Sequence, residues 1–262
     1  RYYNVRKRMT AGFMGILMIL MTVFTCFVPG MQVQAAGKTL IVHYGGRADD
    51  NYEGWNLWLW EEGKDGQQVD FTDTDDYGQV AVYQTNRTPA SIGFIVRLNQ
   101  WEDKDIADDR FVTMDGDTVE IWLTSGEAEY ATQAPDGAAT YDLQALEEAR
   151  LHVYEEADAA KLNIHYYNFA QSYSKDTIEA YAWAGTEVGG SYPYVETDDY
   201  GAVFHVGLKP EDGVTTAGFK IIENGDADAA AEYEADLTKA TDQTLDVYVV
   251  EGNPTFWLSL IH

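Results

Sequence analysis

The chain has 262 residues, and its 44 acidic against 17 basic residues give a formal net charge of −27 at neutral pH. Such an acidic protein repels phosphate, which argues against nucleic acid and anionic membrane surfaces as partners and leaves neutral ligands open. Aromatic residues make up 13% of the chain and prolines number six, a composition typical of a folded protein rather than a disordered one.

Residues 1–36 predict an export signal. A basic head is followed by a largely apolar run over 11–28 and by a small-residue site at 33–35, the order of a secretory signal peptide. A run of this length could also remain as an uncleaved anchor. We expect cleavage and a bacterial protein that is secreted or held at the cell surface. The only cysteine, Cys26, would leave with the signal, so no disulfide or thiol chemistry is expected.

From residue 38 onward the sequence predicts an all-β protein. Short apolar and β-branched runs alternate with turns rich in glycine, aspartate and asparagine, which is typical of an antiparallel sandwich. The first predicted strands cover 38–44, 55–60, 79–83, 92–98 and 118–123.

Three of the seven tryptophans are Trp55, Trp58 and Trp60. Side chains alternate between the faces of a strand, so Trp58 and Trp60 share one face, while Trp55, Leu57 and Leu59 share the other. If the leucines face the core, two indoles lie about 7 Å apart on the outer surface, where a soluble protein rarely exposes them without a ligand. The alternative is that both indoles are core residues beneath a second layer.

The strand pattern occurs twice along the chain. Leu40–Tyr44 returns as Leu162–Tyr166, and the turn Thr74–Gly78 returns as Thr197–Gly201. The order of the motifs and their nearly constant offset indicate two copies of one unit, each with the size of a single sandwich domain.

We therefore predict two tandem immunoglobulin-like antiparallel β-sandwich modules, a first over 37–132 and a second, divergent one over 161–262. A spacer over 133–160 joins them. It is expected to be partly helical because Asp142 can cap a helix there, although 151–154 could equally be extended.

The sequence contains no recognisable catalytic motif: no nucleophile elbow, no zinc-protease motif and no phosphate-binding glycine loop. The acid pairs Asp75-Asp76 and Asp198-Asp199 could in principle serve a glycosidase or bind calcium. Both stand before Tyr-Gly in a turn, where aspartate caps its own backbone, and this turn role is the one expected. We predict a chain without catalytic residues, metal or cofactor.

A series of motifs in the first copy resembles carbohydrate-binding module family 41. The motifs are Leu40–Tyr44, Asn51–Trp60, Asp75–Gly78, Gly93–Arg97, Trp101–Asp105 and Asp109–Phe111. Modules of this family are β-sandwiches that bind α-glucans such as starch, pullulan, amylopectin and glycogen. The resemblance covers about 37–130, with a divergent second copy at about 160–258. It implies the non-catalytic amino-terminal region of a larger secreted pullulanase or amylase.

The resemblance also implies a site. The family stacks glucose rings on a Trp-x-Trp pair, which matches Trp58 and Trp60, and holds sugar hydroxyls with a lysine and an aspartate, which match Lys104 and Asp109. Asp105 and Asp108 are close enough to be alternatives to Asp109. Apolar contact of sugar rings with indoles and a few polar contacts predict a shallow, pre-formed site with an affinity of about micromolar to millimolar.

In the second copy, Tyr181 and Trp183 occupy the positions of the pair, so an aromatic residue still alternates with a small one. The tryptophan and lysine of the polar region are replaced by 224–232, which contains neither. The second module is expected either to bind α-glucan through other polar partners or to have lost binding, with both rings packing on the sheet.

The favoured function is therefore binding of an α-glucan polysaccharide or maltooligosaccharide by a monomer whose two modules gain avidity on a branched polymer. Two alternatives remain: a pair of cell-surface sandwiches that adheres to a protein, and a chain that is itself a hydrolase.

Overall fold

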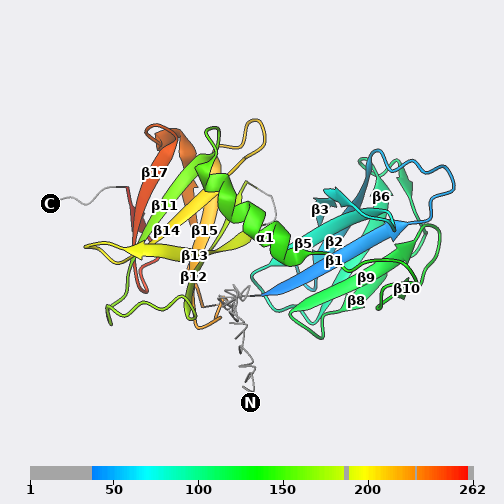
Figure 1. Ribbon diagram of the computed structural model, residues 1–262, viewed down its shortest axis with the longest axis horizontal. Coiled ribbons are helices and arrows are strands. Elements are labelled where there is room, and N and C mark those ends of the chain that lie inside the picture. The colour runs from blue at the N-terminus through cyan, green and yellow to red at the C-terminus, as the bar shows by residue number, and fades with distance from the viewer. Residues whose placement is uncertain (1–36, 186–188, 228, 259–262) are drawn as a thin grey trace, which may run out of the picture. The chain divides into compact units, whose positions relative to one another are not determined.

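The structure is a computed structural model that describes residues 37–185, 189–227 and 229–258 (Figure 1). The predicted export signal lies outside these residues. The described residues form one compact unit. Among the described residues, no helix is long and apolar enough to cross a membrane.

The first module is built from ten strands. They are β1 (Lys38–Gly45), β2 (Trp55–Glu61), β3 (Gln67–Asp70), β4 (Asp73–Thr74), β5 (Gln79–Thr85), β6 (Ser91–Leu98), β7 (Asp103–Lys104), β8 (Arg110–Thr113), β9 (Thr118–Thr124) and β10 (Tyr130–Ala131). One sheet has the order β10-β9-β1-β5-β4. The other has the order β3-β2-β6-β7, with β8 also paired to β6. The five strands predicted for this module are confirmed.

The core of the first module lies between these two sheets. Leu40 and Tyr44 of β1 meet Leu57 and Leu59 of β2 and Phe94 of β6, and all five side chains are fully buried. In β2 the side chains alternate between this core and the outer face, as the period of two requires, whereas β1 and β6 are buried on both faces.

The second module repeats this plan. Its strands are β11 (Ala160–Tyr167), β12 (Ile178–Ala184), β13 (Gly190–Thr197), β14 (Ala202–Leu208), β15 (Thr216–Glu223), β16 (Tyr233–Asp236), β17 (Thr244–Val250) and β18 (Phe256–Trp257), with a 3₁₀ turn at Leu237–Lys239. They form one continuous path, β16-β15-β12-β13-β14-β11-β17-β18. The all-β tandem architecture is confirmed.

The path is continuous because β13 belongs to both layers. Its first half pairs with β12 and its second half with β14, with a register shift between Tyr194 and Glu196. In the first module the corresponding stretch is broken at Phe71 and Thr72, which separate β3 from β4. A β-bulge that bends one strand from layer to layer thus replaces a break between two short strands.

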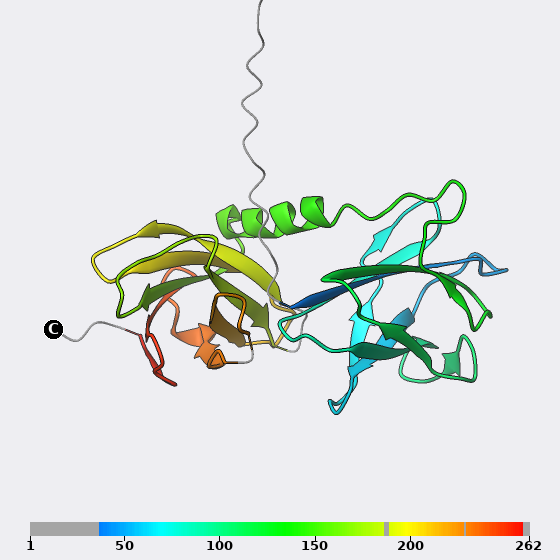
Figure 2. The same ribbon diagram turned by 90° about the horizontal axis from the view of Figure 1, so that it is seen from below.

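The spacer contains the helix α1 (Leu143–His152), followed by a 3₁₀ turn over Val153–Glu155. The Asp142 side chain accepts a hydrogen bond from the Ala145 amide at 2.9 Å, so the predicted cap is confirmed and an extended 151–154 is wrong. The helix packs on β13 and β14 and lies outside the strand layers (Figure 2).

The repeated aspartate turn has the expected structural role. Asp75 Oδ1 accepts hydrogen bonds from the amides of Tyr77 and Gly78, at 2.8 and 2.9 Å. The other oxygen of Asp75 lies 2.6 Å from His43 Nδ1, and the second nitrogen of His43 lies 2.7 Å from Glu120. Asp198 caps its turn in the same way and likewise contacts His165.

Candidate functional site

Trp58 and Trp60 lie on the outer face of the sheet that contains β2. Both are half-buried, whereas Leu57 and Leu59 are 0% exposed. Trp55 packs against the core, with the guanidinium of Arg47 4.1 Å from its ring centroid. The arrangement with the leucines inward is confirmed, and the alternative that places both indoles in the core is wrong.

A glycine lies against each of the two outer indoles. Gly93 of β6 is the cross-strand partner of Trp60, and a Cβ at Gly93 would overlap the Trp60 ring. A Cβ at Gly66, just before β3, would likewise overlap the Trp58 ring, although the cross-strand partner of Trp58 is Gln68. The two rings therefore lie directly on bare backbone, a contact that only glycine permits.

Two further aromatic residues extend this surface. Trp101, in the turn between β6 and β7, has its ring centroid 5.7 Å from that of Trp58, and Phe111 of β8 lies 5.9 Å from Trp60. Trp101 is 47% exposed and Phe111 57% exposed. The sequence showed both only as parts of motifs. Phe111 meets Trp60 because both oppose Gly93, a register that the sequence alone does not reveal.

The predicted polar residues Lys104 and Asp109 come together beside these rings. Lys104 Nζ lies 3.9 Å from Asp109 Oδ1 and donates a hydrogen bond to the carbonyl of Ala107 at 2.8 Å. Lys104 is the cross-strand partner of Arg97, and Asp109 shares strand parity with the outward Phe111. A cation and a carboxylate thus border the aromatic surface on the same face of the sheet.

Asp105, an alternative to Asp109 in the sequence, lies in the interior. Its side chain is 1% exposed and accepts hydrogen bonds from Arg110 at 2.6 Å and from the Tyr44 hydroxyl at 2.7 Å. Burial alone raises the pKa of Asp105, but the hydrogen bonds from Arg110, Tyr44 and Ser125 outweigh it and hold the pKa below its usual value. Asp105 therefore anchors the loop that carries Lys104 and does not reach the surface.

In the second module, Tyr181 and Trp183 occupy the same positions on β12, with centroids 5.9 Å apart. Both rings again lie on glycines, Tyr181 on Gly189 and Trp183 on Gly218. The repeat of the glycines shows that the aromatic surface is an inherited part of the module and not a feature of the first copy alone.

The two rings of the second module differ in exposure. Trp183 is half-buried, but Tyr181 is 6% exposed and packs against Ile222 and Ala227. Its hydroxyl donates a hydrogen bond to the carbonyl of Gln84 at 3.1 Å. Burial raises the pKa of Tyr181 above its usual range. The buried ring corrects the expectation that this tyrosine offers a sugar a free face in this conformation.

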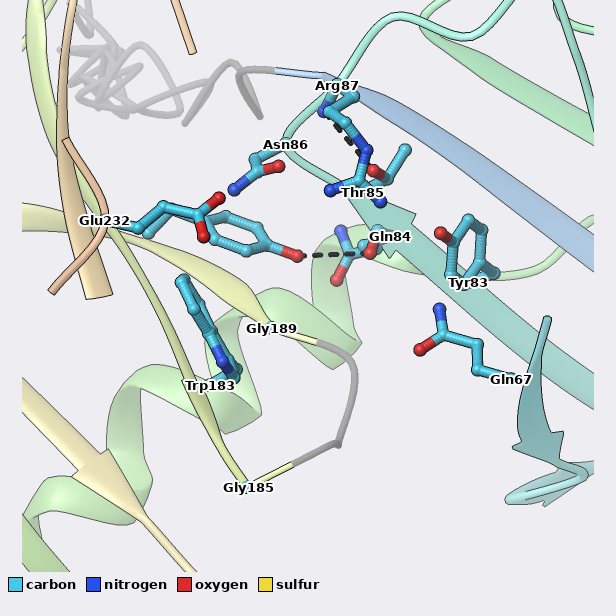
Figure 3. Close-up of a pocket in the computed structure, with 11 residues that line it drawn as sticks. Gln67, Tyr83, Gln84, Thr85, Asn86, Arg87, Trp183, Gly185, Gly189 and Glu232 are labelled. Carbon is cyan, nitrogen blue, oxygen red and sulfur yellow. Dashed lines mark hydrogen bonds between the residues drawn. The ribbon is translucent and has the colours of Figure 1, made fainter. Parts of the chain in front are cut away.

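Trp183 borders a pocket of about 290 Å³ together with Glu232, Asn86 and Arg87 (Figure 3). Lys220 Nζ lies 3.0 Å from Glu232, but the Lys220 side chain is 5% exposed and that of Glu232 is 61% exposed, so only Glu232 of this ion pair borders the pocket. The sequence does not reveal this ion pair, because Lys220 comes from β15 and not from the loop that corresponds to the one carrying Lys104.

The sequence matches the bacterial pullanase-associated domain over residues 38–132 and again over 160–258. The chain belongs to this family. Each match covers one of the two sandwiches, so the internal repeat is a repeat of this pullanase-associated domain.

Solved structures give further comparisons. Family 41 carbohydrate-binding modules from streptococcal virulence factors, described as recognising α-glucan, share 17% identity over 84% of this chain and 97% of theirs, with a TM-score of 0.29. The multi-modular glycogen-degrading pneumococcal protein SpuA shares 15% identity over 86% of this chain and 22% of its own, with a TM-score of 0.31. Ligand-free PulA of Klebsiella pneumoniae shares 14% identity over 72% of this chain and 21% of its own, with a TM-score of 0.27.

Proposed function

We propose that this chain is the non-catalytic α-glucan-binding region of a larger pullulanase-type protein. The observation that carries the proposal is the outer face of β2, where two half-exposed indoles lie beside the Lys104–Asp109 pair. Membership of the pullanase-associated family supports the link to α-glucan degradation.

In the first module, Trp58 and Trp60 stack on successive glucose rings. Sugar faces rich in C–H groups lose water against the indoles, which gives most of the affinity. Lys104 donates hydrogen bonds to sugar hydroxyls and Asp109 accepts them, which fixes the orientation of the chain. Lys104 and Asp109 are partly exposed and partly satisfied by each other, so their net contribution is small and the affinity is modest.

In the second module, Trp183 is the stacking residue and Tyr181 supports it from behind. Glu232 takes the polar role, and the buried Lys220 holds it in place through their ion pair. A single accessible ring gives weaker binding than two, so this module adds avidity on a branched polymer rather than an independent high-affinity site.

Glycogen-containing native gels test the proposal on the 37–262 chain. Replacing Trp58 and Trp60 together by alanine is expected to abolish retardation. Trp257→Ala, which removes a tryptophan that is 41% exposed elsewhere, is the matched control and is expected to leave it unchanged. Unchanged retardation of the folded double variant would overturn the assignment. A protein-adhesive function would instead leave tryptophan fluorescence indifferent to maltooligosaccharides.

The region is proposed to act outside the cell as a monomer, with catalysis supplied by another part of the full-length protein. Reducing-sugar assays on pullulan with the purified 37–262 chain should detect no release. Measurable release that survives purification would make this chain a hydrolase.

A further inference from the structure

The turn between β6 and β7 departs from ordinary backbone preferences at Trp101. Trp101 has a φ of +76°, a left-handed conformation that bulky side chains rarely adopt. Its indole is nevertheless 47% exposed, so burial of the ring does not explain why a tryptophan holds this position. Backbone strain of this kind persists where the surroundings enforce it, often at ligand-binding sites.

Arg97 holds Trp101 in this conformation. Its side chain is 1% exposed, and its guanidinium carbon lies 4.4 Å from the Trp58 ring centroid and 4.6 Å from that of Trp101. Arg97 Nε donates to Asn56 at 3.0 Å and Nη2 to Gln68 at 3.0 Å. The charged fork is thus fixed by two amides and holds both indoles through cation–π contact.

This arrangement is not the one that stability alone would select. Among the described residues, Nη1 of Arg97 is buried without a hydrogen-bond partner, which is costly for a charged group. Positions that break local rules without a structural gain are expected at functional sites.

The second module shows that the same turn forms without these features. In the first module the left-handed residues of this turn are Asn99 and Trp101, with φ values of +47° and +76°, whereas in the second they are Asn224 and Gly225, at +53° and +73°. Asp226 stands where the first module has Trp101, and its φ is not positive. Ile222 stands where the first module has Arg97, and it packs against the buried Tyr181. The fold therefore requires neither a tryptophan nor an arginine at this turn.

We propose that Trp101 is a third sugar-contacting residue of the first module and that Arg97 is the positioning residue that fixes its angle to Trp58. The rings of Trp101 and Trp58 meet at 61°. Two inclined rings fit a glucan that bends at every linkage, as an α-(1→4) chain does, and not a flat β-(1→4) chain. The inference rests on the proposed function, and it explains why the first module would prefer bent glucan chains.

Calorimetric titration of the 37–262 chain with maltotetraose and cellotetraose tests the role of Trp101. Trp101→Ala is expected to weaken maltotetraose binding about tenfold, since one stacked ring is lost. Trp101→Gly is expected to lose the same affinity while keeping or raising the melting temperature, because glycine accepts the left-handed backbone. Phe169→Ala, at a ring that is 70% exposed in the second module, is the matched control.

Arg97→Met tests the positioning role, because methionine fills space but has no guanidinium. The variant is expected to lose the exciton signal that the coupled indoles of Trp58 and Trp101 give in circular dichroism, and to bind maltotetraose about as weakly as Trp101→Ala. An unchanged exciton signal in this variant would remove Arg97 from the proposal.

Wild-type affinity in both Trp101 variants would overturn the proposal, and so would a clear fall in melting temperature in both, which would make Trp101 a structural residue. These outcomes differ from failure of the proposed function, in which the unaltered chain itself does not bind maltotetraose.

Discussion

The two modules carry the same aromatic pair on the same glycines, yet their surroundings differ. Beside Trp58 lie a buried arginine and an exposed tryptophan, whereas beside Tyr181 lie Ile222 and Ala227, which seal its ring. The difference shows that an aromatic pair on a strand is necessary for a stacking surface but not sufficient. The residues around the pair decide whether a ring meets solvent.

The supports beneath the two surfaces differ as well. In the first module the site loop is held by Asp105 and Arg110, whose side chains are 1% and 2% exposed. At the position of Arg110 the second module has Tyr233, which stacks on Phe219 at 5.0 Å and donates to the carbonyl of Asn253. A buried ion pair in one copy corresponds to an aromatic cluster in the other.

The largest expected effect is a loss of stability, and it differs between the buried ion pair of the first module and the aromatic cluster of the second. Asp105→Asn leaves Arg110 buried without its counter-charge and should lower the free energy of unfolding by about 3–5 kcal/mol. Tyr233→Phe removes one hydrogen bond and should lower it by about 1 kcal/mol. Chemical denaturation with fluorescence detection measures both changes. Equal losses would show that the two supports are interchangeable.

The same ion pair predicts a pH dependence. The pKa of Asp105 is lower in the folded state than its usual value, so its stabilisation is complete at neutral pH and is lost as the pH falls through the folded pKa. The unfolding free energy of Asp105→Asn should therefore fall less steeply on acidification than that of the unaltered chain. Parallel acid profiles would contradict this role.

The paired histidines give the next effect. His43 is fully buried between carboxylates at 2.6 and 2.7 Å, whereas His165 is 13% exposed with partners at 2.7 and 3.5 Å. His43→Ala should cost about 3 kcal/mol of unfolding free energy, because it removes a fully buried ring and its two short hydrogen bonds to Asp75 and Glu120. His165→Ala should cost about 1 kcal/mol. A larger loss at His165 would contradict the difference in burial.

Substitution of the glycines beneath the rings should affect the stability of both modules but the sugar affinity of only the first. Gly93→Ala and Gly218→Ala each force a methyl group into an indole and should cost about 1–3 kcal/mol of unfolding free energy. Only Gly93→Ala should also weaken maltotetraose binding strongly, because it displaces Trp60. Equal effects on binding would show that the two modules contribute equally.

The smallest effect concerns the buried tyrosine. Tyr181→Phe removes the hydrogen bond to the Gln84 carbonyl and should lower the unfolding free energy by about 1 kcal/mol without changing maltotetraose affinity. A loss of affinity in this variant would show that the Tyr181 hydroxyl contacts sugar after all.

Much of the fold could be predicted from the sequence. The alternation of leucine and tryptophan separated the two faces of β2 but left open which one is buried, and the repeat of Leu40–Tyr44 defined two modules. The family resemblance then singled out Lys104 and Asp109, which lie together on one face.

What remained hidden depends on register and on distant contacts. Phe111 joins Trp60 only because both strands place Gly93 between them, and Tyr181 is buried by residues far away in the chain. Trp101 combines an exposed ring with a left-handed backbone conformation that a tryptophan does not favour. Strand register and contacts between distant residues cannot be read from local sequence patterns.

The most direct measurement compares maltotetraose affinities of three forms of the 37–262 chain by isothermal titration calorimetry. The double variant of Trp58 and Trp60 to alanine should bind at least about 20-fold more weakly than the unaltered chain, since two stacking rings are lost. Trp183→Ala should change the affinity less than about threefold, since the second module contributes only one accessible ring. A larger loss for Trp183→Ala than for the double variant would place the principal site in the second module and contradict the open platform of the first.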